Sequence, residues 1–181
     1  MNKIYLLLAE GFEELEAFAP VDLLRRAGAA VETVSITPER VVTGARGIPA
    51  VADITLGELD YEAMDMLILP GGYPGYENLG KSAAVRELLL RAYADEKVIA
   101  AICGAPSVLG ELGLLKGHAA TCYPGMEETL GCKALTDKVV ESGRFITSRG
   151  AGTAVDFALA LVARAVSAEQ AEELRKGIVY S

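Results

Sequence analysis

The sequence predicts an α/β fold in which helices cover both faces of a mainly parallel sheet. Short apolar runs rich in branched residues alternate along the chain with longer segments whose apolar residues recur at helical spacing. Of the 181 residues, 51% are hydrophobic, which is enough for one large core. No repeat or low-complexity tract divides the chain, so we expect a single domain over residues 1–181.

The predicted strands are short apolar runs bounded by Gly, Pro or charged residues. They cover residues 4–8, 31–36, 66–69 and 98–102, with shorter candidates at 119–122 and 144–147. The segment 38–49, rich in Gly and Pro, has room for a small hairpin.

Helices are predicted over residues 14–26, 83–93 and 153–165. In the first of them Leu15, Phe18, Val21 and Leu24 recur at helical spacing before a stop at residue 28. Pro20 should kink or divide this helix, because proline has no N–H to donate.

The charge balance argues against nucleic acid or an anionic membrane as a partner. The 17 basic and 25 acidic residues give a net charge of −8, and no basic block stands out. The apolar run before Glu10 is too short for a signal-peptide core or a membrane span. We therefore expect a cytoplasmic protein with no nucleic-acid or membrane partner.

Cysteine and histidine usage narrows the chemistry. The 3 cysteines, Cys103, Cys122 and Cys132, form no C-x-x-C pair, and their odd number argues against a disulfide framework. The only histidine, His118, lies in a polar junction and is typical of a surface loop. We therefore expect no metal site of the usual Cys/His kind and no histidine base.

Cys103 is the most informative residue. It follows the predicted buried strand 98–102 and precedes the segment 104–106, Gly-Ala-Pro, where a helix begins. Free N–H groups and the helix dipole at such a point favour a thiolate, so we expect a cysteine nucleophile elbow and a pKa below the free-thiol value. The alternative is a buried structural cysteine that acts as a small hydrophobe.

Loops at the carboxyl ends of the predicted strands should converge on one cleft. These loops are residues 10–16, 70–73, 103–104 and 148–150. If Cys103 attacks a carbonyl, N–H donors from Gly71, Gly72 and Gly104 could hold the oxyanion, although an ordinary turn also explains the paired glycines.

A carboxyl group is the best available proton carrier in these loops. Glu13 and Glu14 fit a solvated helix start, where acidic residues are favoured in any case. Glu16 shares an inward helical stripe with Ala19 and Leu23, and its burial would be costly without a function. A buried neutral carboxylic acid could hydrogen-bond a thiolate and carry a proton.

Together these motifs resemble the ThiJ/PfpI family, in its branch around the parkinsonism-associated protein deglycase. The resemblance rests on residues 11–16, 20–22, 25–28, 69–72, 101–106 and 147–153, which occur in the family's order over nearly the whole chain. It implies a flavodoxin-like three-layer sandwich and a homodimer.

The resemblance also implies roles for individual residues. Cys103 is the implied nucleophile and Glu16 its protonated partner, with Gly71 and Gly72 on the oxyanion side. Arg149 matches an arginine of the Ser-Arg-Gly loop, and Arg46 matches one that the family brings to the neighbouring subunit's site. The implied activities are cofactor-free conversion of methylglyoxal to lactate, repair of glycated amines and thiols, and oxidant sensing through the cysteine.

Two departures from the family pattern matter. Tyr123 stands where some relatives have a histidine before the proline, and Tyr cannot act as a base near neutral pH. Gly104 stands where the peptidase-like branch has a histidine, so peptidase activity loses its expected base.

Other functions of this fold class lack their residues. A glutamine amidotransferase needs a histidine in the C-terminal half, a receiver domain needs an aspartate in place of Pro70, and a nucleotide site needs a glycine-rich loop where Glu10 and Glu13 stand. The two remaining hypotheses are a small-molecule enzyme acting on carbonyl compounds and a redox-sensing protective protein that uses Cys103 without rapid turnover.

Overall fold

The computed structural model describes residues 3–181, and its centre is a seven-stranded sheet in the order β10-β11-β7-β6-β1-β2-β5. All neighbours are parallel except β10 and β11, which are antiparallel. The strands are β1 (Lys3–Leu8), β2 (Ala30–Ser35), β5 (Ile54–Thr55), β6 (Met64–Leu69), β7 (Val98–Ile102), β10 (Val139–Ser142) and β11 (Phe145–Ser148).

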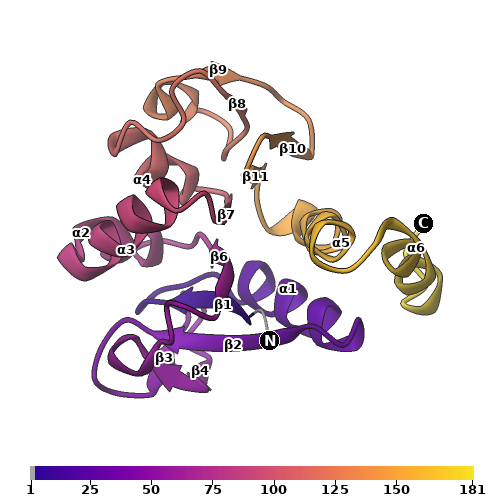
Figure 1. The fold of residues 1–181 in the computed structure, drawn as a ribbon, viewed down its shortest axis with the longest axis horizontal. Coiled ribbons are helices and arrows are strands. Elements are labelled where there is room, and N and C mark those ends of the chain that lie inside the picture. Colours follow the sequence, from indigo (N-terminus) through magenta and orange to yellow (C-terminus); the bar gives the residue numbers. More distant parts are fainter. Residues whose placement is uncertain (1–2) are drawn as a thin grey trace.

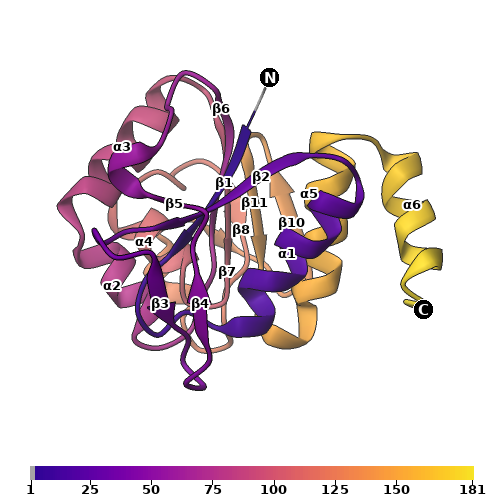
Figure 2. The same ribbon diagram turned by 90° about the horizontal axis from the view of Figure 1, so that it is seen from below.

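Helices cover both faces of this sheet, which makes three layers (Figures 1 and 2). On one face lie α1 (Glu14–Arg26), α5 (Ala154–Ala165) and α6 (Ala168–Gly177), and on the other α2 (Gly75–Lys81), α3 (Ala83–Ala94) and α4 (Pro106–Glu111). Each face has its own core: Leu24 and Phe157 belong to the first, and Leu89 and Leu109 to the second. The flavodoxin-like α/β sandwich is thus confirmed.

Several elements differ from the sequence prediction. Helix α1 is continuous through Pro20, which is buried against the core, so the expected division does not occur. Packing of the apolar stripe of α1 outweighs the single backbone hydrogen bond that proline removes. The edge strand β10, the short helix α2 and the polar helix α6 were not predicted, because their sequences lack a strong apolar period.

Two small sheets lie outside the main one. The strands β3 (Val41–Thr43) and β4 (Pro49–Val51) form the expected hairpin, which extends two residues beyond the predicted range 38–49. The segment predicted as a strand at 119–122 forms only β8 (Ala119–Ala120), which pairs with β9 (Lys133–Ala134) and not with the main sheet. Short 3-10 helices occur at residues 56–58, 127–130 and 151–153, the last directly before α5.

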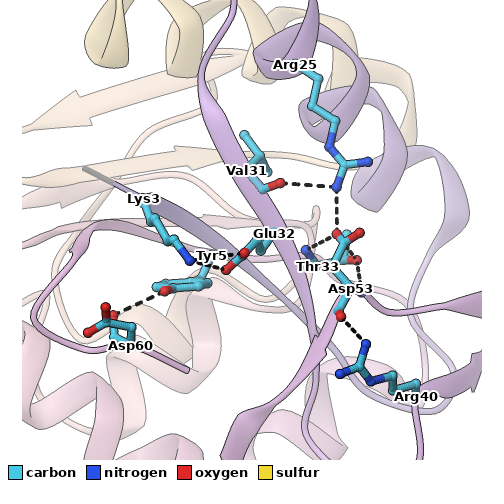
Figure 3. Close-up of polar contacts among 9 residues, drawn as sticks. All are labelled: Lys3, Tyr5, Arg25, Val31, Glu32, Thr33, Arg40, Asp53 and Asp60. Carbon is cyan, nitrogen blue, oxygen red and sulfur yellow. Dashed lines mark hydrogen bonds and ion pairs between the residues drawn. The ribbon is translucent and has the colours of Figure 1, made fainter. Parts of the chain in front are cut away.

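A polar network ties the hairpin to the edge of the sheet (Figure 3). Asp53 accepts hydrogen bonds from the backbone N and the hydroxyl of Thr33, at 2.8 and 2.7 Å, and from Arg25 at 2.6 Å. Arg40, at the base of the hairpin, donates to the backbone oxygen of Asp53. These bonds fix where the hairpin leaves the sheet and therefore where its turn lies.

No helix within residues 3–181 is both long enough and apolar enough to cross a bilayer.

Candidate active site

Cys103 lies at a sharp turn between β7 and α4. Its φ is +65°, a left-handed conformation that is uncommon for a residue with a side chain. The turn is held on both sides, because the Cys103 N–H donates to the Ser148 oxygen at 3.0 Å and its oxygen accepts from the Tyr123 N–H at 2.8 Å. This is the strand-to-helix geometry of a nucleophile elbow, in which strain is held by the surrounding structure.

Glu16 faces Cys103 from the first turn of α1, and only 1% of its surface is exposed. Its Oε2 accepts the Gly71 N–H at 2.8 Å. A side chain at position 71 would bring a Cβ to 2.6 Å from both this oxygen and the Cβ of Cys103. Glycine at this position therefore allows the carboxyl group and the thiol to approach each other.

Three hydrogen bonds join the start of α1 to the loop after β6. Glu13 N–H donates to the Gly71 oxygen at 2.9 Å, Gly71 N–H donates to Glu16, and Glu16 N–H donates to the Glu13 carboxylate at 2.8 Å. Glu13 is thereby the N-cap of α1. This closed ring fixes the Glu16 side chain relative to the loop that carries Gly72.

Burial dominates the electrostatics of the pair. It raises the pKa of Glu16 to about 7; the hydrogen bonds from Cys103 and Gly71 lower this pKa, and the charge on Glu13 raises it. Burial, followed by the charge on Glu16 and the hydrogen bond to it, raises the pKa of the Cys103 thiol to about 12. The expectation of a Cys103 pKa below the free-thiol value is therefore wrong.

The physical reason is that α4 spans only Pro106–Glu111, so its dipole is small, whereas an acidic neighbour and burial both act against a thiolate. Between about pH 7 and pH 12 the two groups hold one proton between them. A thiolate forms when that proton is on Glu16, so the sulfur and the carboxyl group act as a unit.

The amides of Gly72 and Gly104 point toward the sulfur, and both lower the pKa of Cys103. Among the described residues neither amide has a backbone acceptor. Gly71 differs from the expectation: its N–H is already donated to Glu16, so it positions the acid and is not available to an oxyanion. A Cβ at position 104 would lie 2.6 Å from the ring of Tyr76, so a side chain there would displace this ring.

A cavity of about 550 Å³ opens beside Cys103. The predicted residues Glu16, Gly72, Gly104, Tyr123 and Arg46 line it. Further residues also line it: Glu13, which was expected at a solvated helix start, Tyr73, which lies in the expected loop 70–73 but was not singled out, and Tyr76 and Met126, which were not predicted. Tyr73 directly follows the glycine pair and could have been found, whereas Tyr76 enters through the unpredicted helix α2.

The two arginines behave differently from each other. Arg46 lies in the turn of the β3–β4 hairpin and lines the cavity of its own chain. Its backbone N–H donates to the Glu14 carboxylate at 2.8 Å. Arg149 does not reach the cavity lining. Its guanidinium group is directed to the backbone oxygens of Cys122 and Thr136, at 3.4 Å each, so it supports the loop that carries Tyr123.

His118 and the other cysteines lie elsewhere. The His118 ring packs edge-on against Phe145 and contacts the Ser142 hydroxyl at 3.3 Å. Cys122 is 1% exposed and Cys132 is half-buried, and neither lines the cavity. Hollows of about 590 and 660 Å³ occur elsewhere on the chain, but neither contains a cysteine or a histidine.

Comparison with known proteins agrees with this geometry. The model of the DJ-1/PfpI family matches residues 2–164. The chain belongs to the DJ-1/PfpI family. The DJ-1/PfpI solved structures include a cysteine-to-alanine mutant of a DJ-1 superfamily protein from Salmonella typhimurium, which is 38% identical, covers 100% of both chains and superposes with a TM-score of 0.95.

Two curated DJ-1/PfpI relatives differ in length. Protein DJ-1 homolog B of Arabidopsis thaliana is 37% identical over 98% of this chain, which spans only 41% of that relative. A glutathione-independent glyoxalase of Caenorhabditis elegans is 35% identical, over 97% of this chain and 94% of the relative. The family thus includes glyoxalase-type enzymes.

Proposed function

We propose that this protein is a cysteine-dependent, cofactor-free enzyme that converts 2-oxoaldehydes such as methylglyoxal, or their adducts, into 2-hydroxy acids. The observation that carries the proposal is the buried Glu16 carboxyl group, held by the Gly71 amide beside the thiol of a strained elbow. A relative named as a glutathione-independent glyoxalase supports it.

The reaction begins with proton transfer from Cys103 to Glu16. The thiolate then attacks the aldehyde carbon, a C–S bond forms, and the carbonyl π electrons move to oxygen. The Gly72 and Gly104 amides hold this oxyanion, and the proton on Glu16 passes to it to give a hemithioacetal. Glu16 is then ionised and ready to act as a base.

In the second stage Glu16 removes the proton from the former aldehyde carbon, and the electron pair forms an enediolate with the adjacent ketone carbon, whose oxygen takes the negative charge. Glu16 returns the proton to the former ketone carbon, and the hydroxyl proton on the former aldehyde carbon passes to the former ketone oxygen, which gives a thioester of the 2-hydroxy acid. Water cleaves the C–S bond, which releases the acid and restores the thiol. The aldehyde carbon is oxidised and the ketone carbon reduced, so no external oxidant or cofactor is needed.

Proton NMR of methylglyoxal incubated with the protein tests the proposal. We expect lactate to form with the wild type and not with Cys103→Ser, while Cys132→Ser, a change outside the cavity, keeps turnover. Lactate formation by Cys103→Ser at the wild-type rate would exclude the cysteine mechanism.

The second candidate function is oxidant sensing. Cys103 borders an open cavity and can pass its proton to Glu16, which leaves the thiolate that peroxide oxidises, whereas Cys122 is almost fully buried and burial alone raises the pKa of the Cys132 thiol. We expect graded peroxide to add two oxygens to Cys103 and to leave the other cysteines reduced. Peptide mass spectrometry of the wild type and Glu16→Leu tests this, and oxidation spread evenly over all three cysteines would count against a sensor.

We also propose that the chain forms a homodimer through the start of α1 and the tip of the β3–β4 hairpin, which touch where Ala45 N–H donates to the Phe12 oxygen at 2.7 Å. Leu15, Phe18 and Ile48 leave 61%, 36% and 54% of their surface exposed there, which favours coverage by a second copy. Light scattering should show a dimer, and Leu15→Glu should make it monomeric.

We also propose that the protein is located in the cytoplasm. Its three free thiols support this location, because the cytoplasm keeps thiols reduced.

A further inference from the structure

The walls of the cavity beside Cys103 are unusually aromatic. Tyr73 and Tyr76 come from the segment that opens α2, and Tyr123 comes from the loop after β8. Met126 adds a thioether, which contacts aromatic rings favourably. Cys103 therefore has ring systems from two separate segments around it.

The tyrosines contact one another or the nucleophile loop, and two of them leave much of their surface exposed. The rings of Tyr73 and Tyr76 are 6.4 Å apart and inclined by 55°, and Tyr76 lies against Gly104 next to the nucleophile. Tyr123 is anchored by its N–H bond to Cys103. Tyr73 and Tyr123 nevertheless leave 69% and 52% of their surface exposed, which is a large area available to a bound ring.

The volume of the cavity also exceeds what the smallest substrate needs. At about 550 Å³ it falls within the range of roughly 300–1,000 Å³ that holds drug-sized ligands, whereas methylglyoxal carries only a methyl group beyond its two carbonyls. Arg46 adds a planar cation to the lining, which can stack on an aromatic face or pair with a carboxylate product.

We propose that the preferred substrates are aromatic 2-oxoaldehydes, with the aryl ring held among Tyr73, Tyr76 and Tyr123 and the aldehyde carbon at Cys103. This inference rests on the proposed function and specifies its substrate class. The overall change is addition of one water to the aryl glyoxal to give the aryl 2-hydroxy acid, by the same bond changes as above. Arg46 binds the carboxylate that forms.

Substrate selectivity tests the inference. The ratio of kcat/KM for phenylglyoxal to that for methylglyoxal should fall about tenfold in Tyr73→Leu and in Tyr123→Leu, because an aromatic contact is lost while an apolar side chain remains. Tyr93→Leu is the matched control, since Tyr93 stacks on Phe145 outside the cavity, and it should leave the ratio unchanged. An unchanged ratio in both cavity variants would overturn the inference.

A second measurement separates this inference from the proposed function. Mandelate, the aromatic product, should protect Cys103 from iodoacetamide at a concentration roughly tenfold lower than lactate does, and Tyr73→Leu should remove that difference. Absence of turnover with both aldehydes would refute the enzyme, while protection by mandelate would still support an aromatic site. Equal protection by the two acids would overturn the aromatic site whatever the turnover.

Discussion

Burial, hydrogen bonds and nearby charges shift the pKa values of two carboxyl groups, Glu16 and Asp53, in opposite directions. Asp53 is exposed and receives three hydrogen bonds, and although partial burial opposes ionisation, the bonds from Thr33 and the cation of Arg25 hold its pKa below the ordinary value. Glu16 is more deeply buried, with one backbone donor, an acidic neighbour and a thiol, and its pKa rises to about 7. Several hydrogen-bond donors stabilise the ionised form of Asp53, so this residue serves as a structural anchor. Glu16 has few such donors, so its carboxyl group can exchange a proton near neutral pH.

The largest expected effect is on turnover. Glu16→Gln keeps the volume and can still accept the Gly71 N–H, but it cannot carry the proton, so we expect kcat to fall by about 10²–10⁴. Asp53→Asn should retain turnover. Stopped assays with circular dichroism as a folding control measure both, and full activity in Glu16→Gln would remove the carboxyl mechanism.

The next effect is on stability as a function of pH. Because folding raises the pKa of Glu16 from its ordinary 4.5 to about 7, its neutral form is favoured in the folded state, and stability is lost as pH rises between these values. This shift corresponds to about 3 kcal/mol. Urea unfolding should show this loss in the wild type relative to Glu16→Gln, and parallel pH profiles of the two proteins would contradict it.

Asp53 should give a smaller effect of opposite sign. Its lowered pKa adds stability that is present above the ordinary aspartate pKa of about 3.9 and is lost as pH falls below it. Because the side chain is 39% exposed, we expect Asp53→Asn to cost only about 1 kcal/mol at pH 7. The exposed Asp65→Asn is the control, and equal unfolding midpoints for these two variants would show that the network of Figure 3 contributes nothing.

The smallest effect concerns Glu13. Glu13→Gln keeps an oxygen to cap α1 but removes a charge that raises the pKa of Glu16, so the pH profile of turnover should move to lower pH by a few tenths of a unit. Tyr76 and Arg46 also face the cavity and are unchanged in this variant. Glu39→Gln, an exposed site on the segment before the hairpin, should cause no shift, and a shift toward higher pH in Glu13→Gln would reverse the assigned sign.

The position of Cys103 was predictable because its signal is local: a buried apolar strand ends directly before Gly104 and Pro106. The inward direction of Glu16 followed from the helical period in the same way. Helix α2 was not predictable, because a short helix with a glycine at its first position has almost no period, and Tyr76 was lost with it.

The layered α/β fold, the elbow at Cys103 and the inward direction of Glu16 could be predicted from the order of residues, because apolar periodicity and turn residues act over a few neighbouring positions. Three features could be established only from the folded chain: the Gly71 amide holds Glu16, Arg149 supports a loop, and the pKa of Cys103 rises. Each of these depends on burial and on partners that are distant in the chain, and neither is encoded in local spacing.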